Sequence, residues 1–204
     1  MSMASDMEEK TRRVPRQERA ARRVDALLEA AAEVIAESGF DAATMTEIAA
    51  RAGASIGAVY QYFPNKDALV LALRTRYGDA MDEKWSALFA EAETVSVQVL
   101  VEQLFDLMVE FMATHPAYIP LLSVSLNFRR DAVARNRLRE RFADLFRARQ
   151  PALDADEAFR LAEVTLQIVK SLNVLYAPAK PKERKLLVAE YKTAVTSFLL
   201  ARLD

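Results

Sequence analysis

The 204-residue sequence predicts an all-α fold, with an N-terminal three-helix domain followed by a larger C-terminal helical bundle. Turn residues are scarce, with 4 Gly and 7 Pro, whereas sheets need turn residues at close intervals. Hydrophobic residues make up 52% of the chain. In most segments they recur at the i, i+3, i+4, i+7 spacing of an amphipathic helix, so each predicted helix has one face to bury.

The composition also excludes several classes of protein. Cysteine is absent and His115 is the only histidine, which rules out disulfides and thiolate metal sites. Di-iron and prenyl-transfer enzymes built on helical bundles need repeated Glu-x-x-His pairs or clustered aspartates, and the sequence contains neither. We therefore predict no catalytic residues, no metal and no cofactor.

Targeting signals and membrane spans are also missing from the sequence pattern. No apolar run approaches the roughly 18 to 20 residues of a transmembrane helix, and residues 1–11 lack the apolar stretch of a signal peptide. We expect a cytoplasmic protein without a membrane partner. The net charge of −1 means that any nucleic-acid binding must rest on local charge.

Residues 1–19 lack apolar periodicity and predict a flexible basic arm. Cations crowd the end of this arm, where only Glu18 opposes them: they are Lys10, Arg12, Arg13, Arg16 and Arg19, continued by Arg22 and Arg23. Two interpretations stay open: a solvated tail, or an arm that meets phosphates or a minor groove.

A first helix is predicted from Glu18 or Arg22 to Ser38, with Gly39 as its left-handed stop. Its apolar face consists of Val24, Leu27, Leu28, Ala31, Val34 and Ile35. Two short helices follow. Thr44 and Glu47 form a capping box at the start of one, and Ser55 caps the other, which runs from Ile56 to about Phe63 and ends before Pro64.

The spacing of Ala49, Gly53 and Val59 within these short helices predicts a helix-turn-helix between Thr44 and Phe63. Ala49 is small enough for a steep helix crossing, and Gly53 tolerates a positive φ in the turn. Val59 packs its apolar side chain against the first of the two short helices. Two short helices joined by a Gly-containing turn are characteristic of this motif.

The second short helix is predicted to enter a major groove of DNA with its N-terminus leading. The residues at its start and on its solvent side are Ser55, Ile56, Gly57, Ala58, Tyr60, Gln61 and Tyr62. Gln61 can hydrogen-bond a base edge, and the tyrosine hydroxyls can reach phosphates. The alternative is that both tyrosines only cover the edge of the core.

Three further positions are predicted to contact phosphates. Lys66 lies in a first helical turn, where a cation opposes the helix dipole unless an anion binds there. Thr44 and Thr46 can use hydroxyls and amides. Only Arg51 and Lys66 are basic between Val24 and Asp67, so we expect the arm to supply much of the salt-dependent affinity.

The run GFDAATMTEIAARAGASIGAVYQYFPNKDAL, within Val24 to Leu73, closely resembles the N-terminal domain of the tetracycline-repressor (TetR) family. The resemblance implies a homodimer of all-helical subunits that pair through their last two helices, with an inducer pocket among the middle helices. It places Thr44, Thr46, Ser55, Tyr60, Gln61, Tyr62 and Lys66 at positions that commonly contact DNA. At Ile56 the sequence departs from the family's pattern, because many members have a basic or polar residue at this position.

We predict domain limits of 20–67 for the helix-turn-helix domain and 68–204 for a ligand-binding and dimerisation domain. The further helices are predicted at Lys66–Phe89, Ser96–Thr114, Ala117–Leu126, Asp131–Arg149, Asp154–Ala177 and Pro181–Leu203. The last two carry broad apolar faces, which predicts that they form the dimer interface.

An aromatic and methionine stripe in the C-terminal domain has two possible roles, as plain core or as the lining of a pocket. The candidate ligand-binding residues are Trp85, Phe89, Phe105, Met108, Met112, Asn127 and Gln167. Gln103 and Asn173 are further polar candidates. A second basic run, from Arg129 to Arg149, is either a solvated helix face or an attractor of an anionic ligand.

The leading hypothesis is a ligand-responsive repressor that binds palindromic double-stranded operator DNA as a homodimer and is released by an unknown small-molecule inducer. The alternative is a protein of the same fold that binds DNA or a partner without an inducer. Activation instead of repression stays open, because it depends on where the operator lies.

Overall fold

The computed structural model describes the backbone of residues 3–91, 95–122, 124 and 132–203, and side chains within 18–89, 95–122, 124 and 136–203. Within these ranges the chain is helical, in the order α1 to α9, and no helix is long and apolar enough to cross a membrane. The helices form two compact units. This confirms the predicted all-α class.

The first unit contains α1 (Met3–Ala42), α2 (Met45–Arg51), α3 (Ile56–Tyr62), the start of α4 (Lys66–Glu91) and α6 (Tyr118–Leu122). Its core includes most of the predicted apolar face of α1: Leu27, Leu28, Ala31, Val34 and Ile35 are each no more than 5% exposed, whereas Val24 is half-buried. The helix begins at Met3 rather than at Glu18 or Arg22, so the backbone of the predicted arm continues α1.

Gly39 interrupts α1 with φ 80° and ψ 168°. The positive φ agrees with the prediction, although this ψ lies in the extended mirror region that is open almost only to glycine, not in the left-handed helical region. Residues 40–43 therefore leave the axis of α1 and lead to the start of α2.

The compact units divide within α4, between Arg76 and Tyr77, and residues 116–126 belong to the first unit. The predicted limit at residues 67 and 68 lies earlier, because the sequence does not show how the start of α4 packs. Arg76 forms an ion pair with Glu29 of α1, and Nη1 of Arg74 donates to the carbonyl of Val124 at 3.3 Å. These contacts tie the start of α4 to the first unit.

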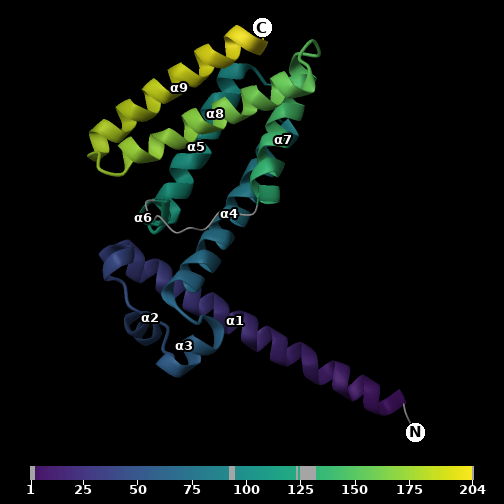
Figure 1. The fold of residues 1–204 in the computed structure, drawn as a ribbon, viewed down its shortest axis with the longest axis vertical. Helices are drawn as coiled ribbons and strands as arrows, with labels where there is room; N and C mark the ends of the chain where they lie inside the picture. Colours follow the sequence, from purple (N-terminus) through teal and green to yellow (C-terminus); the bar gives the residue numbers. More distant parts are fainter. Residues whose placement is uncertain (1–2, 92–94, 123, 125–131, 204) are drawn as a thin grey trace. The chain divides into compact units, whose positions relative to one another are not determined.

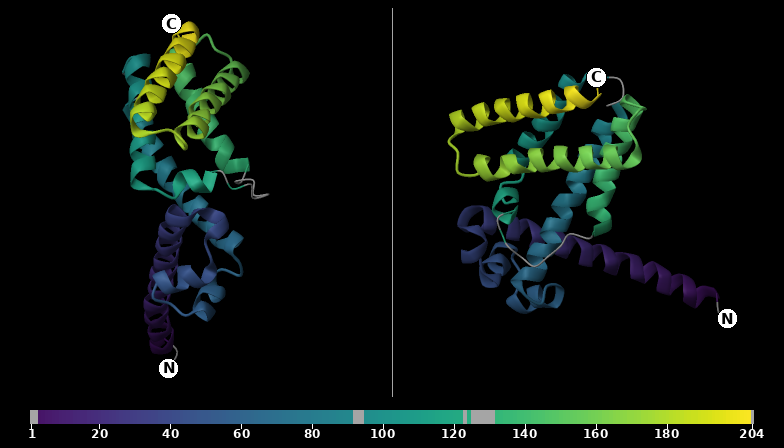
Figure 2. Two further views of the ribbon diagram at one scale, coloured as in Figure 1. Left: turned by 90° about the vertical axis from the view of Figure 1, so that its left-hand side faces the viewer. Right: turned by 45° about the horizontal axis from the view of Figure 1, so that its top comes forward.

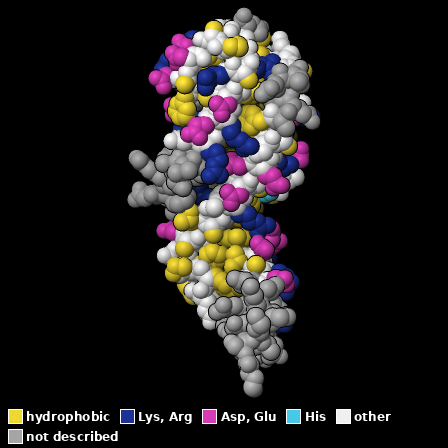
Figure 3. Space-filling view, turned by 90° about the vertical axis from the view of Figure 1, so that its right-hand side faces the viewer, with side chains coloured by type: hydrophobic (Ala, Val, Ile, Leu, Met, Phe, Trp, Pro, Cys, Tyr) yellow, Lys and Arg dark blue, Asp and Glu magenta, His cyan; other side chains and the backbone are white. Residues whose placement is uncertain are grey.

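The second unit contains the rest of α4 with α5 (Val97–Thr114), α7 (Ala132–Arg149), α8 (Ala155–Tyr176) and α9 (Pro181–Leu203). Its helices pack mainly as the pairs α7–α8, α8–α9 and α5–α9, and α8 and α9 run antiparallel, side by side, in Figures 1 and 2. On the face in Figure 3, acidic and basic side chains are interspersed along this unit.

The core of the second unit is built on α5 and on aromatic rings of α4 and α7. The buried face of α5 includes Leu100, Leu104, Phe105, Met108, Phe111 and Met112, each no more than 5% exposed. Phe142 of α7 makes edge contacts with the rings of Trp85 and Phe89, at centroid distances of 5.3 and 4.7 Å. Edge-to-face pairs at such distances stabilise a core beyond simple burial.

Candidate nucleic-acid interface

Two short helices, α2 and α3, are each fixed at the N-terminus by a side-chain cap. Thr44 Oγ1 accepts from the Glu47 amide at 3.2 Å, and the Glu47 carboxylate accepts from the Thr44 amide at 3.0 Å. Ser55 Oγ accepts from the Ala58 amide at 3.2 Å. Both predicted caps are confirmed, and each satisfies an amide that the helix itself cannot pair.

The turn between α2 and α3 is made by Gly53, whose φ of 59° lies in the left-handed region. The Gly53 amide donates to the Ala50 carbonyl at 3.1 Å, and the Ala54 amide to the Ala49 carbonyl at 2.9 Å. A residue with a Cβ pays a steric cost at this φ. The predicted need for glycine here is confirmed.

The buried side of the pair consists of Ile48 and Ala49 from α2 and Val59 from α3, which are 0%, 3% and 0% exposed. Val59 is the only buried residue of α3. One buried apolar side chain therefore holds α3 against α2, and most of the other side chains of α3 are exposed.

The outward side of α3 carries the side chains that the sequence assigns to DNA contacts. Ile56, Tyr60 and Tyr62 are 40%, 50% and 37% exposed. Ser55, Gly57 and Gln61 are exposed as well, and Ala58 is half-buried. Half of the Tyr60 surface is open to a partner, and the contacts of both tyrosines with DNA stay predictions.

The side-chain ammonium of Lys66 is held within the first unit. Its Nζ donates to the carbonyls of Phe40 at 2.7 Å, Ala43 at 2.9 Å and Asp41 at 3.2 Å, and it lies 4.4 Å from the centre of the Phe40 ring. An ammonium has three N–H donors, so each has an acceptor. The contacts join the start of α4 to the segment between α1 and α2; the phosphate contact of Lys66 stays a prediction.

Arg51, the other cation of this region, is also paired. Its guanidinium meets Glu37 through two bonds of 2.9 and 2.7 Å and Glu33 through one of 3.1 Å. The bond from Arg51 lowers the pKa of Glu37, and these two carboxylates raise that of Arg51. The acids of α1 thus neutralise a base of α2. Three cations of the predicted arm and its continuation have described side chains, Arg19, Arg22 and Arg23; all three are exposed on α1, and Arg22 lies 4.0 Å from Glu18.

The structure scatters the candidate ligand residues between core and surface. Trp85, Phe105, Met108 and Met112 are buried and Phe89 is half-buried, whereas Gln167 is exposed on α8. Asn127 lies outside the described residues. Among the described side chains, Trp85 Nε1, Gln103 Oε1 and Asn173 Oδ1 are buried without a hydrogen-bond partner.

Several arginines of the second basic run have partners in the second unit. Arg139 pairs with Glu163 at 3.3 Å, Arg149 donates to the Val95 carbonyl, and Arg141 lies 5.6 Å from the centre of the Phe89 ring. Sequence reasoning missed these contacts because their partners lie far along the chain. It missed the carbonyl site of Lys66 for the same reason.

The two short helices α2 and α3 are joined by a turn at Gly53, and α3 packs on α2 through Val59 while its other side is exposed. This arrangement defines a helix-turn-helix DNA-binding protein. The chain matches the family of bacterial regulatory proteins named tetR over residues 27–73, and a tetracyclin repressor-like C-terminal domain over residues 96–199. The second match alone spans about half of the chain. The protein therefore belongs to the TetR family of transcriptional regulators, which bind operator DNA and act as dimers.

Relatives with similar sequences are also transcriptional regulators. The HTH-type transcriptional regulator BetI of Rhizobium meliloti is 34% identical over 155 residues, which cover 73% of this chain and 75% of the relative. BetI of Escherichia coli O45:K1 is 29% identical over 140 residues, covering 65% and 72%. The HTH-type transcriptional activator FasR of Mycolicibacterium smegmatis is 46% identical over 67 residues, covering 33% and 29%.

Solved structures show the same fold. A TetR-family regulator from Pectobacterium atrosepticum superposes with a TM-score of 0.69 at 20% identity, covering 92% of this chain and 97% of that one. One from Streptomyces coelicolor gives a TM-score of 0.66 at 22% identity, covering 89% and 99%. At such low identity these likenesses establish the fold alone.

Proposed function

We propose that the protein is a ligand-responsive repressor that binds a palindromic operator as a homodimer and releases it when a small molecule binds the second unit. The observation that carries the DNA-binding part is the exposed side of α3, which offers Tyr60, Gln61 and Tyr62 around a single buried anchor, Val59. Gln61 is suited to a bidentate contact with adenine, and the tyrosine hydroxyls to phosphates.

Ile56 extends this proposal to the start of α3. Its side chain is 40% exposed in the first turn of the helix that leads into the groove. An apolar side chain in a major groove contacts the methyl group of thymine. At a position where many members of the family have a polar residue, this chain has an apolar side chain, Ile56, which is suited to contact a thymine.

The proposed inducer site lies around Trp85. Its indole is 4% exposed and Nε1 has no acceptor, although a buried donor without a partner costs about 1–3 kcal/mol. Gln103 Oε1 is likewise buried and unpaired. A ligand with an acceptor for the indole N–H would remove that cost, which supports binding of a mainly apolar molecule with a few polar atoms.

Helix α4 is the element through which we propose that the inducer acts. Lys66 and Arg76 fasten its first part within the first unit, and Trp85 lies in its second part. A ligand at Trp85 that prefers a different position of α4 would change the separation of the two recognition helices. A coupling of about 1–3 kcal/mol would weaken operator binding roughly 5- to 150-fold.

Trp85 is the only tryptophan in the chain, so its fluorescence reports on the proposed site directly. In a screen of small molecules, an inducer is expected to change Trp85 emission saturably and to weaken operator binding over the same concentration range. A Val99→Ala control, at a position on α5 that is 42% exposed, is expected to keep both responses.

A regulator without an inducer is the second candidate, since Trp85 and its neighbours also make a well-packed aromatic core. It predicts that no compound in the screen gives a saturable change. A compound that changes Trp85 emission while operator affinity stays constant would contradict the proposed coupling.

A further inference from the structure

A stripe of four arginines runs along the first part of α1. Arg12, Arg16, Arg19 and Arg23 recur at the i, i+4, i+7, i+11 spacing, and the backbone of α1 is helical through all four positions. At about 3.6 residues per turn, these positions fall within a sector of about 60° around the helix axis and span about 16 Å along it. Between residues 12 and 23 the one acid, Glu18, lies about 100° from the nearest of them. The arginine stripe is therefore a face of one charge sign.

The arginine stripe lies on the side of α1 that meets the helix-turn-helix. Glu37 falls within about 40° of Arg23 around the axis, and its carboxylate pairs with Arg51 of α2 at 2.7 Å. Figures 1 and 2 show α1 continuing past α2 and α3 toward the N-terminus. Arg23 is about 21 Å from Glu37 along the helix, which exceeds the width of about 12 Å of a major groove. The stripe thus extends beyond the groove that α3 would enter.

The two described guanidinium groups of the stripe have no partner within the protein. Arg19 and Arg23 are exposed, and neither forms an ion pair or a hydrogen bond with a described residue. Every other described cation of the first unit is engaged by a carboxylate or a backbone carbonyl. These cations are Arg22, Arg51, Lys66, Arg74 and Arg76. Arg19 and Arg23 are therefore available to an external anion.

DNA binding by the first unit needs such cations. The recognition helix α3 contains no charged residue, and the charged groups of Arg51 and Lys66 are occupied by acceptors of the protein itself. Phosphate contacts made by lysine and arginine supply the salt-dependent part of DNA affinity. Arginine suits this task because its planar guanidinium fork matches the geometry of a phosphate.

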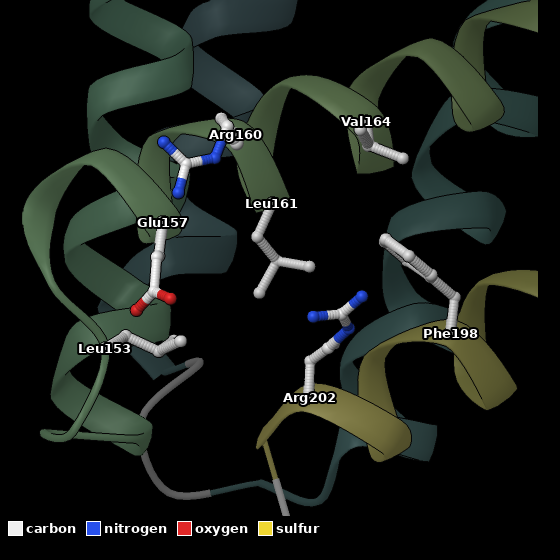
Figure 4. A pocket seen from close by; sticks show the side chains of 7 residues that line it. All are labelled: Leu153, Glu157, Arg160, Leu161, Val164, Phe198 and Arg202. Carbon is white, nitrogen blue, oxygen red and sulfur yellow. The ribbon is translucent and has the colours of Figure 1, made fainter.

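The exposed arginines of the second unit are arranged differently. Arg160 and Arg202 line a groove of about 260 Å³ where α8 meets α9, together with Glu157 and the apolar side chain of Leu161. Figure 4 shows these charged groups around the hollow. A carboxylate beside two arginines on an apolar floor makes a mixed surface, which attracts a polyanion less than a stripe of one sign.

We propose that the arginine stripe binds the phosphate backbone of DNA beside the groove that α3 reads, and supplies the cations that α3 lacks. The inference rests on the proposed operator binding and adds a second contact surface to it. Successive phosphates of one strand follow at about 3.4 Å along the DNA axis, so the stripe matches the length of about five of them. Because phosphates carry no sequence information, the stripe strengthens binding to operator and unselected DNA alike.

The double variant Arg19→Gln with Arg23→Gln tests this proposal by the salt dependence of operator binding. In a homodimer it removes four phosphate contacts, which is expected to reduce the slope of log K against log salt by about 3.6. The affinity deficit relative to the wild type should then grow by about 100-fold when salt falls from about 200 to 50 mM. Both substitutions are at exposed positions, so an unchanged melting temperature shows that the fold is intact.

A matched control removes the same charge from other faces of α1. Arg13→Gln with Arg22→Gln changes positions about 90° from the middle of the stripe, and the slope is expected to change by less than about 1, the effect of one phosphate contact. The Arg19 and Arg23 double variant should keep the wild-type ratio of operator to unselected-DNA affinity, because only phosphate contacts are lost.

Ethylation interference locates the contacts on the DNA. Phosphates outside the groove read by α3 are expected to interfere with wild-type binding and to stop interfering in the Arg19 and Arg23 double variant. A double variant whose slope falls no further than that of the control would overturn the proposal. Wild-type protein without any sequence preference would instead contradict the proposed operator binding itself.

Discussion

Replacing Gly53 by valine is expected to abolish sequence-specific DNA binding. Gly53 has φ 59°, and a residue with a Cβ pays about 1–2 kcal/mol there, more when it is β-branched. Relief of that strain would move Ala54 away from the Ala49 carbonyl and displace α3 from its packing against α2. Operator affinity is then expected to fall by about three orders of magnitude or more, to the nonspecific level, measured by titration of fluorescent operator DNA.

Two further variants separate backbone conformation from simple bulk. Gly53→Asn is expected to retain more affinity than Gly53→Val, because asparagine tolerates the left-handed region. Gly57→Ala adds a Cβ that meets no atom within 4 Å, so its melting temperature should be equal or higher. A Gly53→Val protein with wild-type stability and specific affinity would show that α3 does not depend on this turn.

Lys66→Met is expected to lower both stability and operator affinity. The substitution keeps an unbranched side chain but leaves the carbonyls of Phe40, Asp41 and Ala43 without the ammonium that now binds them. Hydrogen bonds to a charged group contribute about 1.5–3 kcal/mol. Because Lys66 is half-buried, we expect a total loss of roughly 2 kcal/mol in the free energy of unfolding.

The salt dependence of DNA binding distinguishes this positioning role from a phosphate contact. A lost phosphate contact reduces the slope of log K against log salt by about 0.9, whereas loss of the carbonyl contacts lowers affinity at an unchanged slope, which is the result we expect. Lys84→Met, at an exposed pair with Glu110 at 3.4 Å, should change stability by less than about 1 kcal/mol. A reduced slope at wild-type stability would instead assign Lys66 to the DNA.

The helix-turn-helix could be predicted from the sequence because its determinants are local. Thr44 and Glu47, Ser55, and Gly53 act on amides or backbone angles within a few residues, so their spacing alone indicates the structure. The apolar periodicity of α1 is local in the same sense, and its predicted face is buried except for Val24, which is half-buried.

The rest of the site depends on contacts that spacing does not encode. The carbonyls around Lys66 converge because Gly39 redirects the chain more than twenty residues earlier. Arg51 is neutralised by acids of another helix, and the groove at Leu161 forms only where α8 meets α9. The limit between the units, set by the contacts of Arg74 and Arg76, is likewise long-range.

Selection of bound DNA from a random pool tests most directly whether α3 reads an operator as part of a dimer. The selected sequences are expected to converge on a palindrome whose half-sites are about 34–36 Å apart, so that two copies of α3 meet successive major grooves. The wild-type protein should bind that site at least about a thousandfold more tightly than unselected DNA. Binding that depends on salt but shows no sequence preference after selection would contradict the proposed role of α3.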